Sequence, residues 1–78
     1  MNIGIYIYNQ AEVLDFSGPF EVFSVANRLA KLGWNIWLVA EEESLVEARG
    51  VFQVKPHNSI QNVLELDVLI VVGGGSFR

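Results

Sequence analysis

Cysteine is absent from this chain of 78 residues. The chain therefore contains no disulfide, no thiolate metal site and no thiol nucleophile of its own. Basic residues are scarce, with five Lys and Arg against nine Asp and Glu and a formal net charge of −4. An acidic chain without a basic stripe argues against nucleic-acid binding by this segment. The single histidine, His57, has no second His or Cys to complete a metal site, so we expect a surface histidine and no metal.

Long apolar runs are also missing. The longest, such as residues 68–72, are far short of the roughly 20 residues that a membrane-spanning helix needs. The N-terminus has no basic region of the kind that opens a signal peptide. These features predict a cytoplasmic protein without a membrane partner.

Apolar residues are nevertheless abundant, at 51% of the chain, and aromatic residues make up 12%. A chain of this size buries only about 60% of its unfolded surface, so its stability margin is thin. The composition fits a part of a larger domain, or a subunit that buries one face against a partner.

In three segments, the residues that would point to either face of a strand are apolar. This pattern is typical of strands buried on both faces of a parallel sheet. The three segments are residues 3–8, 34–40 and 67–72. A helix is predicted between the first two, from Ser17 to about Leu32. Ser17 can cap it, Pro19 fits its first turn, and Gly33 can end it in a left-handed conformation.

Residues 45–54 predict a small hairpin around Arg49 and Gly50, or two short edge strands. Asn58, with Gln61 three residues later, resembles a capping box for a short helix through Leu64. The order of elements is that of the opening half of a doubly wound α/β domain with a mostly parallel sheet. No helix follows the last strand, so we expect residues 1–78 to be the N-terminal part of one domain, completed by further residues or by a second chain.

Ligands of open parallel sheets bind beyond the carboxyl ends of the strands. The segments 9–18 and 73–78 follow such ends, and they become neighbours if strands 3–8 and 67–72 pair. Asp15 would then face the backbone N–H groups of the glycine run that begins at Gly73, as half of an active site. Alternatively, Asp15 only stabilises the start of the helix through the helix dipole. Glu21 is a secondary candidate. The favoured interpretation is that it belongs to a narrow polar stripe of the helix that faces solvent, made of Glu21, Ser24, Arg28 and Lys31.

The glycine run does not fit a nucleotide site. A dinucleotide fingerprint would need glycine where Arg78 stands, and the Gly-Lys-Ser/Thr of a phosphate loop is absent. Ser76 lacks the G-x-S-x-G context of a nucleophile elbow. The residues alone thus indicate a site and name no reaction.

The segment Leu14–Phe23, with its Asp-x-x-Gly-Pro-x-Glu-Val-Phe pattern, and the segment Asp67–Gly74 together resemble the ThiJ/PfpI superfamily of glutamine-amidotransferase-like proteins. Within it, the pattern is similar to the isonitrile hydratase branch and to the amidotransferase-like domains of AraC-type regulators. The resemblance covers the whole chain. It implies a flavodoxin-like sandwich of helices around the sheet, usually a homodimer, with a cysteine nucleophile and no cofactor.

The resemblance also implies roles for individual residues. Asp15 matches the acid that hydrogen-bonds the nucleophilic cysteine, where it would exchange a proton in a closed pocket. Gly73 and Gly74 match the glycine pair that supplies backbone donors. The chain departs from the family in two ways: Val72 stands where proline is usual, and the segment with the cysteine is not present.

Four functions remain open at this point. The intact protein would hydrate a small-molecule isonitrile to an N-substituted formamide, or would be the ligand-sensing domain of an AraC-type regulator. It could also be a glyoxalase, deglycase or protease relative acting on carbonyl compounds. The last alternative is a short structural subunit that folds only against a partner.

Overall fold

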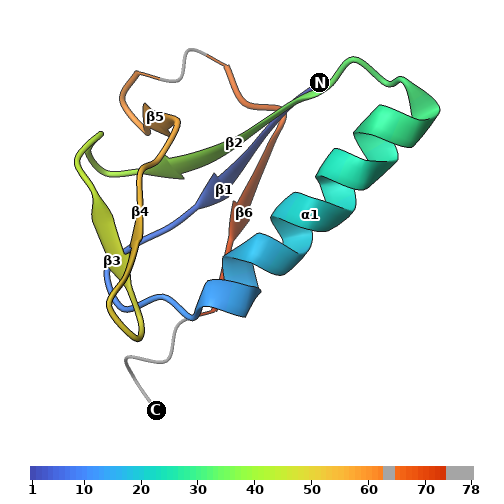
Figure 1. Ribbon diagram of the computed structural model, residues 1–78. Helices are drawn as coiled ribbons and strands as arrows, with labels where there is room; N and C mark the ends of the chain where they lie inside the picture. The colour runs from blue at the N-terminus through green and yellow to red at the C-terminus, as the bar shows by residue number, and fades with distance from the viewer. Residues whose placement is uncertain (63–64, 74–78) are drawn as a thin grey trace.

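A four-stranded parallel sheet organises the chain, whose computed structural model describes residues 1–62 and 65–73 (Figure 1). The strand order is β5-β2-β1-β6, and every neighbouring pair runs parallel. A separate antiparallel pair is formed by β3 and β4. The elements are β1 (Asn2–Tyr6), α1 (Val13–Ala30), β2 (Asn35–Ala40), β3 (Val46–Ala48), β4 (Phe52–Val54), β5 (Asn58–Ser59) and β6 (Val68–Val71). The predicted α/β class with a mostly parallel sheet is confirmed.

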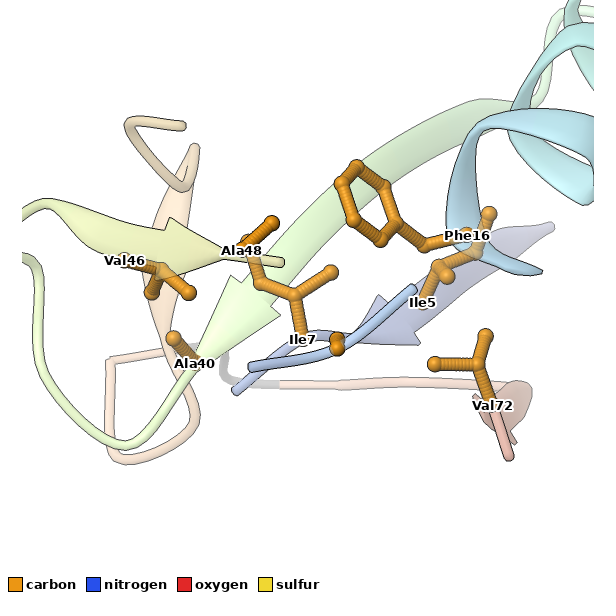
Figure 2. Close-up of a cluster of buried hydrophobic side chains, with 8 residues drawn as sticks. Ile5, Ile7, Phe16, Ala40, Val46, Ala48 and Val72 are labelled. Atoms are coloured by element: carbon orange, nitrogen blue, oxygen red, sulfur yellow. The ribbon is translucent and has the colours of Figure 1, made fainter. Parts of the chain in front are cut away.

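The core lies between α1 and one face of the sheet. Ile5 and Ile7, at and just beyond the end of β1, are fully buried, and Phe16 of α1 joins them at 4% exposure. Ala48 of the β3–β4 hairpin and Val72, just after β6, belong to the same cluster (Figure 2). Successive side chains of a strand point to opposite faces of the sheet. On the face of Ile5, the strand pairing places Leu38 of β2 and Ile70 of β6 beside it.

The second face of the sheet is less covered than the sequence predicted. Leu69 and Val71 are 45% and 66% exposed, and they pair with Gly4 and Tyr6 on β1. Leu66 covers this face closely at Gly4, because a Cβ added to Gly4 would lie 3.0 Å from Leu66 Cδ1. The prediction of burial on both faces is therefore wrong for β6, because among the described residues α1 covers only the opposite face.

Helix α1 starts earlier than predicted. It begins at Val13 with Glu12 as N-cap, so Ser17 lies inside the helix and does not cap it. Pro19 is consequently an interior residue rather than part of the first turn. At the other end the left-handed cap is Lys31, with φ 53°, two residues before the predicted Gly33. Asn27 holds this end, because its side chain accepts a hydrogen bond from Trp34 N and donates one to Trp34 O, both 2.9 Å.

Residues 45–54 form the predicted hairpin, with Val46 opposite Val54. The predicted short helix starting at Asn58 is wrong in its described part. Asn58 and Ser59 instead form β5, an edge strand beside Val39 and Ala40, followed by a turn. Backbone pairing with the free edge of β2 satisfies donors and acceptors that a first helical turn would leave open. Ser59 stabilises this turn, because its Oγ accepts a hydrogen bond from Asn62 N at 3.2 Å. Leu64, the predicted end of the helix, lies outside the described residues.

No helix in the described part of the chain has the length and apolar character needed to cross a membrane.

Candidate functional site

The candidate site lies at the carboxyl ends of β1 and β6. The two strands are neighbours, with Ile5 beside Ile70 and Tyr6 beside Val71, so the condition for bringing the two loops together is met. Beyond the strand ends the pairing continues through a side chain: Tyr8 Oη donates a hydrogen bond to Val72 O at 3.0 Å. Gly73 follows directly and is exposed. Gly74, the second predicted donor, lies outside the described residues.

Asp15 occupies the first turn of α1 and is partly buried. Its chain neighbour Phe16 and the chain neighbour of Gly73, Val72, belong to one buried cluster (Figure 2). Asp15 and Gly73 are therefore each adjacent in sequence to a residue of this cluster. The helix dipole favours a carboxylate at this position, so the structural and the catalytic interpretations of Asp15 are compatible.

The β3–β4 hairpin fixes the position of this first helical turn. Gln10 N donates to Glu47 O at 2.8 Å, and Arg49 N donates to Ala11 O at 2.9 Å. A salt bridge of 3.2 Å joins Arg49 Nε to Glu12 Oε1. Both side chains of the salt bridge are substantially exposed, so it contributes only about 0–1 kcal/mol. The backbone bridge is thus the main restraint on the segment that leads to Asp15.

Pro19 changes the backbone beside Asp15. Inside a helix, proline offers no N–H to the carbonyl four residues earlier and its ring crowds that carbonyl, at a cost of about 3 kcal/mol. The carbonyl affected here is that of Asp15. The Gly18-Pro19 pair therefore leaves the main chain at the candidate acid without its usual helical hydrogen bond. Adding a Cβ at Gly18 would meet no described atom within 4 Å, so close packing does not explain this glycine.

The other residues considered from sequence lie away from this point. Glu21 is exposed on α1, as the stripe interpretation predicted. The ring of His57 stacks on Phe20, with centroids 5.9 Å apart, and its Nδ1 accepts a hydrogen bond from Leu38 N at 2.8 Å. His57 is thus exposed, as predicted, but it also secures the edge of β2. Within residues 1–62 and 65–73, no three His, Asp or Glu side chains come together as a metal site would require.

Sequence reasoning missed a hollow of about 210 Å³ at the carboxyl ends of β1 and β2. Its polar lining includes Tyr6, Tyr8, Glu41 and Ser44. The rings of Tyr6 and Tyr8 lie 6.2 Å apart at 30°, and Tyr6 Oη donates to Glu41 Oε1 at 3.4 Å. The alternation of the two tyrosines along the first strand was the only sequence signal for this feature.

The environment of Tyr6 raises the pKa of its phenol above the ordinary value of 10.0, first through burial and then through the charge and hydrogen bond of Glu41. Because the folded state holds this proton more tightly than the unfolded state, the associated stability is complete below about pH 10 and is lost as the pH rises through the higher folded pKa. We expect Glu41→Gln to move the Tyr6 pKa back toward 10.0. An absorbance titration of the phenols in a Tyr8→Phe background measures it, and an unchanged Tyr6 pKa in Glu41→Gln contradicts the assignment.

Solved structures share this fold. A ThiJ/PfpI family protein from Pseudomonas syringae matches with a TM-score of 0.79 and 24% identity, over 94% of this chain and 28% of that one. An AraC family transcriptional regulator from Pseudomonas putida matches with a TM-score of 0.78 and 19% identity, over 94% and 46% of the two chains. A DJ-1 superfamily protein from Agrobacterium tumefaciens matches with a TM-score of 0.67 and 20% identity, over 99% and 39%.

The chain therefore spans less than half the length of each of these three structures. No protein-family model matches the sequence, and no curated protein does. At these identities the structural likeness establishes the fold.

Proposed function

We propose that this chain, which has the flavodoxin-like fold seen in DJ-1, ThiJ and PfpI proteins, is the N-terminal part of an isonitrile hydratase-like enzyme. The complete protein converts an isonitrile and water to an N-substituted formamide without a cofactor. The observation that supports this proposal is the Asp-x-x-Gly-Pro-x-Glu-Val-Phe segment at the start of α1, in which Asp15 is partly buried.

In the proposed reaction a cysteine thiolate from the rest of the domain attacks the terminal isonitrile carbon, and a proton is delivered to that carbon. Water then adds to the resulting thioimidate, and the thiol leaves as the formamide forms. Asp15 receives the thiol proton, returns it to the substrate and then orients the attacking water. The N–H of Gly73, with that of Gly74, donates hydrogen bonds to the charge that develops in the site.

The test is to incubate the complete protein with an alkyl isonitrile and to follow formation of the N-substituted formamide. Turnover that disappears when the domain's cysteine is replaced by serine supports the proposal. A complete protein that binds no isonitrile and produces no formamide contradicts it. The same assay with glyoxals and small peptides covers the glyoxalase, deglycase and protease alternatives.

The second candidate is the ligand-sensing domain of a transcriptional regulator. It is favoured by the P. putida AraC family regulator and by a putative transcriptional regulator protein from Vibrio parahaemolyticus, which matches with a TM-score of 0.77 and 17% identity. A C-terminal helix-turn-helix domain in the complete protein, together with ligand-dependent DNA binding and no turnover, would support this candidate over the enzyme.

We also propose that the complete protein is a homodimer. Leu14, Val22 and Leu29 lie on one face of α1 and are 80%, 65% and 76% exposed, and an exposed apolar stripe of this kind is a candidate for burial against a second copy. We expect Val22→Asp to shift the complete protein from dimer to monomer in sedimentation measurements, whereas Glu21→Gln leaves it a dimer. A dimer that survives Val22→Asp would place the interface elsewhere.

A further inference from the structure

Tyr8 connects the first strand to the glycine loop. It lies two residues beyond the end of β1, and its ring packs against the buried cluster that contains Ile7 and Val72. From this anchored position its hydroxyl donates a partly buried hydrogen bond to Val72 O at 3.0 Å. In the described part of the chain, no group of α1 or of the β3–β4 hairpin hydrogen-bonds Val72 O. The end of β6 is therefore held by a side chain rather than by a further backbone pair.

The carbonyl that Tyr8 holds belongs to the same peptide unit as the N–H of Gly73. A peptide unit is planar, and in its trans form the C=O and N–H bonds point in opposite directions. The peptide bonds of the described residues are all trans. When Tyr8 fixes the Val72 carbonyl, it therefore also fixes the direction of the Gly73 N–H, which points away from the Tyr8 hydroxyl.

Glycine makes this restraint necessary. Without a Cβ, Gly73 can adopt positive as well as negative φ values at little cost. The 72–73 peptide could therefore rotate easily if its carbonyl were free. A hydrogen bond to the carbonyl also polarises the peptide unit and strengthens its N–H as a donor. A catalytic donor is effective only if its direction is set before the reaction.

We infer that Tyr8 is a positioning residue, which fixes the direction of the Gly73 N–H at the carboxyl end of β6. The inference rests on the proposed function for what the N–H stabilises, while the orientation itself follows from the Tyr8–Val72 hydrogen bond. Tyr8 does not contact the substrate in this scheme and acts through the 72–73 peptide.

Tyr8→Phe removes the hydroxyl and keeps the packed ring. Tyr6→Phe is the matched control, because Tyr6 lies on the same segment, its ring is 6.2 Å from that of Tyr8, and its hydroxyl bonds Glu41 rather than Val72. The first measurement, on the complete isotope-labelled protein, compares the Gly73 amide resonance and its exchange rate with solvent. We expect both to change in Tyr8→Phe and to stay at the wild-type values in Tyr6→Phe.

The second measurement compares steady-state kinetics with an alkyl isonitrile. We expect Tyr8→Phe to lower kcat by roughly 10- to 100-fold with little change in KM, since loss of a whole oxyanion donor typically costs on the order of 10²–10³-fold. Tyr6→Phe keeps the wild-type kcat. If Tyr8 only stabilised the fold, Tyr8→Phe would lower the melting temperature. It would not lower kcat while leaving KM nearly unchanged.

The two proposals fail in different ways. A Gly73 amide that is unchanged in Tyr8→Phe overturns the positioning role, whatever the activity. A changed Gly73 amide in a protein that turns over no isonitrile supports the positioning role and overturns the proposed hydratase function. A changed amide with an undiminished kcat shows that the Gly73 N–H is not a catalytic donor and overturns the inference.

Discussion

Asp15→Asn in the complete protein is expected to lower turnover by about 10²–10⁴-fold, the usual range for loss of a positioned proton-transfer group. The amide keeps the size of the side chain and its ability to accept hydrogen bonds at the first turn of α1, but it can neither take up nor release the thiol proton. The melting temperature should change little, because asparagine is also tolerated near a helix N-terminus. Kinetics with an alkyl isonitrile and a thermal melt of the same preparation measure the two effects separately.

Glu21→Gln is the matched variant for this test. Glu21 is on the same helix and carries the same charge change, but it is exposed, so we expect wild-type turnover. If Asp15→Asn retains full activity, the proton-transfer role is refuted and Asp15 only stabilises the helix. If Glu21→Gln is the inactive variant, the secondary candidate is the acid. A comparable loss of activity in both variants would point to a general effect of charge on α1.

Phe16→Ala is expected to destabilise the complete domain by about 3–5 kcal/mol, the typical cost of truncating a buried phenylalanine. Phe16 is 4% exposed and packs with Ile5, Ala48 and Val72 in the cluster that joins α1, the sheet and the hairpin. Small domains have only about 5–15 kcal/mol of total stability, so this variant should be unfolded or close to unfolding at ambient temperature. Urea denaturation followed by circular dichroism gives the free energy of unfolding.

Leu14→Ala is the control for Phe16→Ala. Leu14 precedes Asp15 in the same helical turn and is 80% exposed. In the Val22→Asp background, where the proposed dimer is dissociated, its truncation should change the free energy of unfolding by less than about 0.5 kcal/mol. An equal loss in the two variants would mean that Leu14 is buried in the complete protein, against a second copy or the remainder of the chain. A Phe16→Ala variant with native stability would contradict the core described above.

The neighbouring residues Asp15 and Phe16 are thus expected to have separable roles. The first should affect turnover without affecting stability, and the second should affect stability throughout the domain. The Gly18-Pro19 pair, which costs helical stability at this place, is consistent with a segment selected for more than folding, since local violations of helix rules concentrate at functional sites.

The sequence by itself determined the parallel sheet, the turn within residues 45–54 and the two loops at the carboxyl ends of strands, where the site is predicted. Each follows from a short-range signal: the apolar residues on both alternations of residues 3–8, the Arg49-Gly50 turn, and the two loops that follow strand ends. Pairing of β1 with β6 then brings Asp15 and Gly73 to the same edge of the sheet, as the rule for parallel strands predicts.

Only the tertiary structure decided where α1 begins, that Asn58 and Ser59 form a strand, and that Tyr8 holds Val72. All three depend on partners far away in the chain: the hairpin fixes Ala11, the edge of β2 pairs with β5, and the Tyr8 hydroxyl reaches across 64 residues of sequence. Local propensities for a cap at Ser17 or Asn58 are worth about 1 kcal/mol. Backbone pairing and burial of neighbouring side chains together exceed this amount, so the long-range contacts determine the conformation at these positions.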